Sequence, residues 1–259
     1  MSLSFETLIL DIDESGIATL SINRPKQLNA LNNQVFEDLD AAIDEVISND
    51  AIKAVIITGA GDKAFVAGAD IKEFADFNSE QAVTLSSRGH RVFQKLEDVT
   101  KPVVAAIQGY ALGGGFELAL ACHLRVASQT TVVGLPEVSL GLIPGYGGTQ
   151  RLPQLVGKAK ALELIMSGRF VKAEEALQLG IVNQIAEDDV LEAAKKMLQG
   201  IIRQAPIAIK NAILATKEAG KASGFGSEAK LFGELFSTAD FKEGTSAFIE
   251  KRKPNFSGK

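Results

Sequence analysis

The sequence predicts an α/β fold that is followed by a helical C-terminal region. Up to about residue 147, short apolar runs bounded by glycine or proline alternate with segments of helical periodicity, and such alternation is typical of α/β proteins. Beyond that point the apolar residues repeat mainly at helical spacing. We therefore expect a core over residues 1–195 and a helical region over residues 196–259.

The N-terminal part of the chain predicts a hairpin, a helix and a buried strand. Residues 5–11 and 17–22 are expected to form strands, because apolar and hydroxyl residues alternate in the second of them. Asn32 or Asn33 can cap a helix that has one apolar face. The continuous apolar run over residues 53–58 suits a strand that is buried on both faces.

The rest of the chain continues the alternation and then becomes helical. The expected elements of the middle part are a helix over 79–97, a strand over 103–107, a helix over 113–121 and a strand over 124–127. In the C-terminal part, apolar residues from Val190 to Ile201 repeat at helical spacing. Residues 206–218 and 227–251 are expected to be helical as well.

The composition is that of an ordinary globular protein. Of 259 residues, 46% are hydrophobic and 23% charged, with a net charge of −5 that argues against a broad nucleic-acid-binding surface. The single cysteine, Cys122, excludes an internal disulfide and fits a reducing compartment. The N-terminus has no secretory pattern, and no apolar run approaches the roughly 18 residues of a membrane span. We expect a soluble, cytoplasmic protein.

Two glutamates stand in apolar, glycine-rich surroundings, where a carboxylate is costly to bury. Glu117 follows the triple glycine at 113–115, and Glu137 lies in the tripeptide Leu-Pro-Glu. Either one alone can be explained as an acid in the first turn of a helix, stabilised by the helix dipole. Because buried unpaired carboxylates are rare, two of them in one region indicate general acid–base catalysis.

The glycine-rich segments can supply backbone N–H donors to a substrate. Glycines 113–115 at a helix N-terminus leave room for a substrate oxygen to approach unpaired N–H groups, which would stabilise negative charge on it. The same glycines can equally serve the tight packing of a helix on a strand. The small-residue loop over 65–72 can supply a second donor, although on its own it is explained as a plain loop.

Other chemistries find little support in the sequence. His90 and His123 are the only histidines, so a multi-histidine metal site cannot form, and we expect no bound metal. Cys122 is expected to be a small core residue rather than a nucleophile. The chain has neither a Gly-x-Ser-x-Gly elbow nor a Gly-x4-Gly-Lys-Ser/Thr phosphate loop.

Five segments of the chain resemble the crotonase superfamily, and within it the enoyl-CoA hydratases. They are NRPKQLNAL at 23–31, AFVAGADIKEF at 64–74, KPVVAAIQGYALGGGFELAL at 101–120, GLPEVSLGLIPGYGGTQRL at 134–152 and AFIEKRKPNF at 247–256. The segments cover nearly the whole chain in order. The presence of both glutamates favours the hydratases, because many relatives keep one or neither.

The resemblance implies both an architecture and a mechanism. The core would be a crotonase-type spiral of strand–strand–helix units, and the C-terminal helical region would drive trimer formation within a homohexamer of two trimers. The N–H groups of Ala69 and Gly114 would form an oxyanion hole for the thioester carbonyl. Glu117 would act mainly as a base towards a water molecule, and Glu137 would protonate the α-carbon of a trans-2-enoyl-CoA. The product would be a 3-hydroxyacyl-CoA.

The resemblance also implies which residues hold the acyl-CoA substrate, with coenzyme A as part of that substrate and no separate cofactor. The implied CoA-binding residues are Lys26, Leu28, Ala67, Asp70 and Ile71, with Phe248 and Lys251 reaching the CoA of a neighbouring subunit. The implied acyl-pocket residues are Phe74, Phe116 and Tyr146, with Phe77 nearby. For Lys251 the alternative is a solvated basic tail, and for each aromatic residue it is core packing.

Three other functions stay open at this point. A crotonase-fold isomerase that moves the double bond of an enoyl-CoA needs only one carboxylate. A dehydratase for a dedicated short 3-hydroxyacyl-CoA would run the same site in reverse. An RNA-binding or scaffold homologue belongs to another class, and the negative net charge argues against it.

Overall fold

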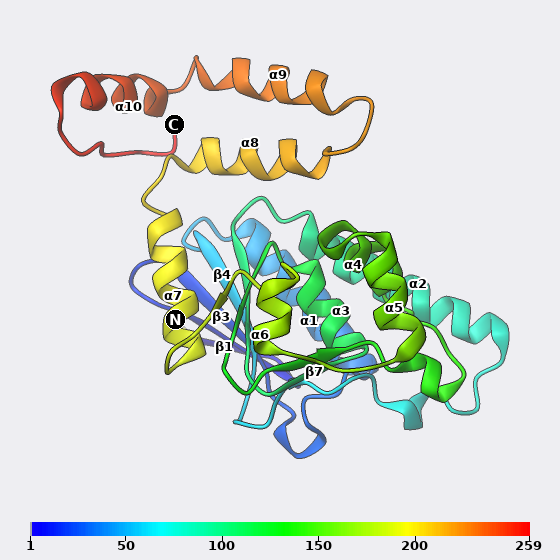
Figure 1. The fold of residues 1–259 in the computed structure, drawn as a ribbon. Coiled ribbons are helices and arrows are strands. Elements are labelled where there is room, and N and C mark those ends of the chain that lie inside the picture. Colours follow the sequence, from blue (N-terminus) through cyan, green and yellow to red (C-terminus); the bar gives the residue numbers. More distant parts are fainter. Residues whose placement is uncertain (1) are drawn as a thin grey trace. The chain divides into compact units, whose positions relative to one another are not determined.

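The computed structural model describes residues 2–259 and divides into two compact units; Figure 1 labels the α-helices and some of the strands. The first unit runs to Val99 and resumes from Val103 to Lys195. The second consists of Thr100–Pro102 and Lys196–Lys259. Within residues 2–259, no helix is long and apolar enough to cross a membrane.

The first unit is built on a larger and a smaller β-sheet. The larger sheet, in spatial order, consists of β1 (Ser2–Ser4), β2 (Leu8–Ile12), β3 (Ile17–Ile22), β4 (Ala54–Gly59), β6 (Val103–Ile107), β8 (Leu124–Ala127) and β11 (Gln184–Ile185). The smaller sheet consists of β10 (Val171–Lys172), β9 (Val132–Gly134), β7 (Tyr110–Leu112) and β5 (Ala64–Val66). β3, β4, β6, β8 and β11 pair in parallel, as do β5, β7 and β9.

A strand–strand–helix unit repeats along the first unit. β4 joins the larger sheet, β5 joins the smaller one, and α2 (Ser79–Glu97) follows. β6, β7 and α3 (Gly114–Ala121) repeat this order, and so do β8, β9 and α4 (Gly148–Val156), with the short 3-10 helix η3 (Glu137–Leu140) in between. The predicted α/β class is confirmed, and the repeat is the spiral that the resemblance implied.

The N-terminal elements form for the reasons that the sequence suggested. β2 and β3 make an antiparallel hairpin whose turn contains Gly16 at φ +85°, a conformation that favours glycine. The side chain of Asn32 caps α1 (Asn33–Ser48) by accepting the N–H of Val35 at 3.0 Å. β4 is buried from Ala54 to Ile57, in agreement with the strand predicted there to be covered on both faces.

The remaining helices of the first unit cover the sheets and close its core. They are α5 (Lys158–Ser167), α6 (Ala173–Gln178) and the first part of α7 (Val190–Ile201), which continues into the second unit. α4 and α5 meet at Gly157, whose φ of +76° ends one helix and begins the next. The core is continuous from the hairpin to α6 and includes the fully buried rings of Phe36, Phe65, Phe93 and Phe116.

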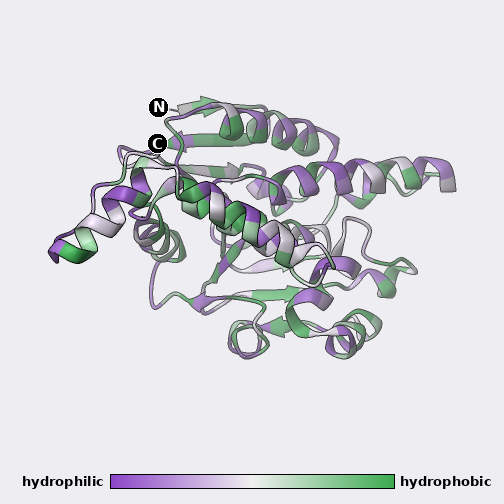
Figure 2. Cartoon of the chain, turned by 90° about the horizontal axis from the view of Figure 1, so that it is seen from above, coloured by the Kyte–Doolittle hydropathy of each residue, from purple (hydrophilic) through white to green (hydrophobic). Residues whose placement is uncertain are grey.

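The second unit is helical, as predicted, but one predicted helix is in fact two. In place of a single helix over 227–251, the structure has α9 (Gly224–Leu235) and α10 (Ala239–Glu250), preceded by α8 (Pro206–Lys217). The chain breaks there because Thr238 caps α10, with its Oγ1 accepting the N–H of Phe241 at 3.0 Å. Figure 2 shows hydrophobic and hydrophilic stretches alternating along the helices of the chain.

Candidate active site

Three neighbouring strands of the smaller sheet end beside the predicted catalytic residues. Ala69 follows β5, Gly114 and Glu117 follow β7, and Glu137 follows β9. These strands are parallel, so their carboxyl ends lie at one edge of the sheet. The spiral thereby brings together four residues that are up to 68 positions apart, counted from Ala69 to Glu137.

The first and last residues of the triple glycine each have a steric reason to lack a side chain. Gly113 has φ +49°, and a Cβ there would lie 2.8 Å from Oε1 of Glu137. A Cβ on Gly115 would overlap the backbone carbonyl of Val66 in β5. The glycines therefore serve both roles that the sequence left open. They allow α3 to pack closely on β5, and they leave the N-terminus of α3 free of side chains.

The backbone around Ala69 is fixed by its neighbours. Leu31 donates its N–H to the Gly68 carbonyl at 2.9 Å and accepts the N–H of Asp70 at 2.7 Å. Among the residues that the structure describes, no acceptor is recorded for the Ala69 N–H or for that of Gly114 at the start of α3. A Cβ on Gly113 would lie 4.0 Å from Cα of Gly68, so the residues that precede these two donors are in close proximity.

Glu117 is buried in the first turn of α3, with 1% of its surface exposed. Its Oε1 accepts the backbone N–H groups of Tyr146 at 2.8 Å and Gly148 at 2.7 Å. The pKa of this carboxyl is raised to about 7: burial is the main cause, the charge of Glu137 acts in the same direction, and the two N–H donors oppose the rise. Glu117 is therefore a carboxyl that can accept and release a proton near neutral pH.

Glu137 begins the 3-10 helix η3, next to the entrance of α3. Burial raises its pKa above the ordinary value. Its Oε2 is buried and has no hydrogen-bond partner among the described residues. A buried carboxyl oxygen without a protein partner is costly, and it is suited to bind a proton, a water molecule or a substrate group.

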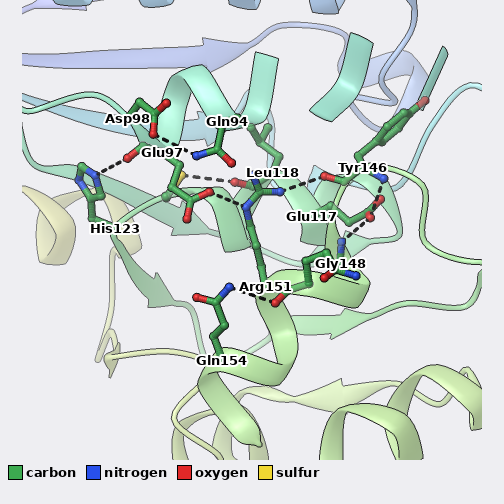
Figure 3. A network of polar contacts seen from close by, with 12 residues as sticks. Gln94, Glu97, Asp98, Glu117, Leu118, His123, Tyr146, Gly148, Arg151 and Gln154 are labelled. Atoms are coloured by element: carbon green, nitrogen blue, oxygen red, sulfur yellow. Dashed lines mark hydrogen bonds and ion pairs between the residues drawn. The ribbon is translucent and has the colours of Figure 1, made fainter. Parts of the chain in front are cut away.

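A polar network holds the segment that donates to Glu117 (Figure 3). Arg151 on α4 donates from Nη1 to the carbonyl of Tyr146 at 3.0 Å and from Nε to Oε2 of Glu97 on α2 at 2.9 Å. His123 accepts the N–H of Val103 at Nδ1 and lies 3.3 Å from the Glu97 carbonyl through Nε2. Arg151 and Glu97 were not predicted from the sequence, in which the one signal is an arginine three residues after a glycine-rich motif.

The structure brings the predicted CoA-binding residues of the first unit into two adjacent segments. Ala67 donates its N–H to the Leu28 carbonyl at 3.0 Å, next to the contacts that fix Ala69. Asp70 forms an ion pair with Arg24 at 3.4 Å, and Ile71 is exposed. The sequence analysis did not single out Arg24.

Lys26 and Leu28 lie beside an open cavity of about 270 Å³. The other residues around it are Pro25, Asn29, Ala60, Gly61, Asp62, Lys63 and Ala64. The cavity lies between residues 25–29 and residues 60–64, and Leu28, which lines it, also accepts the N–H of Ala67.

The two predicted CoA contacts near the C-terminus belong to the second unit. Phe248 is 86% exposed on α10, and Lys251 ends this helix with φ +55°. The neighbouring Arg252 is held by Glu243 and Glu250, so it supports the local structure. The roles of Phe248 and Lys251 stay predictions.

The aromatic residues predicted for the acyl pocket differ in burial. Phe116 is buried in the core and is 1% exposed. Tyr146 is also buried, with its ring 5.1 Å from that of Phe36 and 5.9 Å from that of Phe93. Phe74 is half-buried and Phe77 is exposed. Tyr146 also covers the start of α3, because a Cβ on Gly114 would lie 3.0 Å from its ring.

The two histidines and the single cysteine are the other candidates for metal binding or nucleophilic chemistry. Within the described part of the chain, no group of three or more histidine, cysteine, aspartate or glutamate side chains is arranged to hold a metal ion. Cys122 is buried, its Sγ lies 3.5 Å from the Leu118 carbonyl, and burial raises the pKa of the thiol to about 12. Such a thiol is a poor nucleophile at neutral pH.

Comparison with known proteins places this geometry in a family. The family described as enoyl-CoA hydratase/isomerase matches residues 13–259. The chain is 44% identical to a short-chain-enoyl-CoA hydratase of Clostridium acetobutylicum, over 93% of this chain and 94% of that protein. It is 41% identical to a crotonyl-CoA hydratase of Syntrophomonas wolfei, over 99% of this chain and 100% of that protein.

Solved structures agree with the sequence comparison. The crystal structure of an enoyl-CoA hydratase from Bacillus anthracis superposes with a TM-score of 0.93 at 37% identity, covering 98% of this chain and all of that one. An enoyl-CoA hydratase from Geobacillus kaustophilus superposes with a TM-score of 0.93 at 38% identity, covering 99% of this chain and all of that one. The chain belongs to the enoyl-CoA hydratase/isomerase family.

Proposed function

We propose that this protein is an enoyl-CoA hydratase that adds water reversibly to a trans-2-enoyl-CoA and forms a 3-hydroxyacyl-CoA. The observation that carries the proposal is the pair of carboxyls at the entrance of α3, Glu117 and Glu137, both with a raised pKa. The names of the relatives agree with the hydratase activity that the sequence resemblance implied. Their names also favour a short acyl chain as the substrate.

The two carboxyls divide the proton transfers between them. Oε1 of Glu117 is held by two backbone N–H groups, which leaves Oε2 to accept a proton from the attacking water. The water oxygen forms a bond to the β-carbon, and the electron pair of the double bond moves towards the α-carbon and the thioester. Glu137 delivers its proton to the α-carbon, so the water adds from one side of the double bond. Because like charges in proximity disfavour double ionisation, the pair holds one proton before the reaction.

The backbone N–H groups of Ala69 and Gly114 stabilise the charge that develops on the thioester oxygen. Two converging backbone donors, one of them at the N-terminus of α3, act strongly on such an enolate-like oxygen. Support comes from the lack of a recorded protein acceptor for either N–H within residues 2–259 and from the proximity of Gly68 to Gly113. Drawing electrons onto this oxygen makes the β-carbon electrophilic.

The CoA moiety binds along the segments that carry Lys26, Leu28, Ala67, Asp70 and Ile71. In a homohexamer of two trimers, Phe248 and Lys251 of one subunit contact the CoA bound by its neighbour. The exposed phenylalanines of the second unit support association of the chain through this region. The protein works in the cytoplasm on intermediates of fatty-acid β-oxidation or of short-chain acyl-CoA metabolism.

Purified protein mixed with crotonyl-CoA and with longer trans-2-enoyl-CoAs tests the proposal. We expect the absorbance of the conjugated enoyl thioester to fall and the product to be a 3-hydroxyacyl-CoA, with the highest kcat/KM on short chains. A 3-enoyl-CoA as the product would indicate an isomerase. The absence of reaction at every chain length would refute the hydratase proposal.

A further inference from the structure

We propose that Arg151 positions the catalytic carboxylate of Glu117 through the Tyr146–Gly148 turn and that Glu97 holds Arg151 in place. The inference rests on the proposed hydratase function, since it concerns the base of that reaction. Arg151 and Glu97 have no assigned contact with reacting atoms, so they act as positioning residues.

A single turn of the chain fixes Glu117. The N–H groups of Tyr146 and Gly148 both donate to the same oxygen, Oε1, at 2.8 and 2.7 Å. Gly147 lies between the two donors at φ +109°, which lets both N–H groups point at one acceptor. A shift of this turn therefore moves or reorients the carboxylate.

Arg151 fixes this turn. Its Nη1 donates to the carbonyl of Tyr146, so Tyr146 uses its N–H for Glu117 and its C=O for Arg151. A Cβ on Gly147 would overlap the guanidinium, which shows that the guanidinium packs directly against the turn. Arg151 is 9% exposed, and it folds back on the first turn of its own helix, α4.

Glu97 fixes Arg151 from another element. Oε2 of Glu97, near the end of α2, accepts from Nε of Arg151 at 2.9 Å. The guanidinium thus bridges α2 and the turn with two nitrogens in a rigid plane. A lysine at position 151 keeps the charge but has a single nitrogen, so it cannot keep this geometry.

Arg151 also acts on Glu117 through its charge. Its cation lowers the pKa of Glu117 and so opposes the effect of burial. The titratable and charged groups around the two residues are Glu137 from η3, Cys122 from α3, Tyr146 from the turn, and Glu97, His90 and Arg91 from α2. Of these, Glu97 contacts Arg151 directly and partly neutralises its charge.

Substitutions at Arg151 separate the two effects. We expect Arg151→Gln and Arg151→Lys to lower kcat for crotonyl-CoA hydration by up to about 10²-fold with little change in KM, as misplacement of a catalytic group does. At low pH, kcat falls because Glu117 becomes protonated, and we call this fall the acidic limb of the kcat–pH profile. In Arg151→Gln the acidic limb also moves to higher pH, by about 0.5 unit, because the Glu117 carboxylate loses a neighbouring cation. Arg151→Lys retains the positive charge, so the acidic limb of this variant should move less.

Glu97→Gln should have the opposite effect on the pH profile. The amide oxygen still accepts from Arg151, so kcat stays within about threefold of that of the wild type. The charge of Arg151 is then no longer neutralised, and the acidic limb moves to lower pH. A role limited to stability predicts no such pair of opposite shifts.

Arg91→Gln is the matched control, because Arg91 lies on α2 and lines the same open pocket as Glu97 and Arg151 but pairs with Asp40. It should leave kcat and the acidic limb unchanged. Arg151 variants that fold and match this control would overturn the inference while leaving the hydratase function intact. If they fail to fold, an unshifted profile of Glu97→Gln overturns it. A wild-type protein without hydratase activity would instead refute the proposed function.

Discussion

Burial raises the pKa of Glu117 into the range where the carboxyl can exchange a proton at neutral pH, and the same burial destabilises the folded state. The pKa of its carboxyl rises to about 7 from an ordinary value of 4.5, mainly through desolvation. Such a pKa suits a general base that works near neutral pH. The charged carboxylate is nevertheless disfavoured in the folded protein relative to the unfolded chain, so the site is a place where function and stability conflict.

This conflict predicts the pH dependence of stability. Between pH 4.5 and 7 the unfolded chain releases the Glu117 proton while the folded protein retains it, so the wild type loses stability as the pH rises through this window. Glu117→Gln removes that loss and should stabilise the protein above pH 7 by on the order of 3 kcal/mol. At pH 4.5 the two proteins should unfold alike. Urea unfolding at both pH values measures the difference, and a gap that does not grow with pH would contradict the pKa.

The oxyanion donor at Gly114 can be tested without a change of charge. Gly114 is the first residue of α3, a position where proline is accommodated and where its ring takes the place of the N–H. We expect Gly114→Pro to lower kcat by about 10²- to 10³-fold more than Gly114→Ala, which adds a Cβ near the Tyr146 ring but keeps the donor. Equal turnover of the two variants would show that this N–H does not contribute.

The sequence could indicate the two carboxyls but not the residues that position one of them. Glu117 and Glu137 stand out because their apolar flanks make them costly to bury without a task. Arg151 is part of a contact with Glu97, 54 residues away in the chain. Such a pair can be recognised only once α2 and α4 are placed side by side, because a lone arginine in the sequence also suits an exposed helix.

At the scale of elements, α3 depends on its close approach to β5. The backbone carbonyl of Val66 occupies the place that a side chain at residue 115 would need. Gly115→Ala should therefore lower the free energy of unfolding by about 1–3 kcal/mol. The control is Gly200→Ala in α7, where a Cβ meets nothing within 4 Å and helix propensity should leave stability equal or higher. Equal stability of both variants would contradict the packing described for α3.

The sequence predicted long elements well and the strands that carry the site poorly. α2 and β6 have the predicted bounds, because 19 residues of helical periodicity and a run of five apolar residues are clear local patterns. β5, β7 and β9 have three residues each, too few to show a period of two. These strands are stabilised by pairing with strands far along the chain, and the local sequence does not show that pairing.

At the scale of the whole molecule, the alternation between two sheets had no local signature. Nothing in the periodicity of β4 and β5 says that successive strands join different sheets, and only the resemblance to a family implied the spiral. The comparisons confirm that family and its fold. The break between α9 and α10 was not predicted, because Thr238, which caps α10, lies within an apolar pattern that continues through both helices.

The exposed apolar residues of the second unit predict assembly. Phe225, Phe232 and Phe248 are 88%, 62% and 86% exposed, and large apolar side chains exposed together are typical of a surface that contacts another protein. We expect sedimentation to give a species of about six times 27.5 kDa. Phe232→Asp should shift the protein to smaller species, and Lys230→Gln, which changes the net charge on α9 by the same amount, serves as the control. A wild-type monomer at micromolar concentration would contradict the assembly.

The central claim is that Glu117 and Glu137 together carry out hydration, and turnover of crotonyl-CoA by their glutamine variants tests it most directly. Glutamine keeps the shape of each side chain but cannot exchange the proton, so we expect each variant to lose at least about 10²-fold in kcat while its thermal unfolding remains cooperative. Glu192→Gln, at an exposed site on α7, should retain full activity. Near-wild-type hydration by either Glu117→Gln or Glu137→Gln would contradict the account.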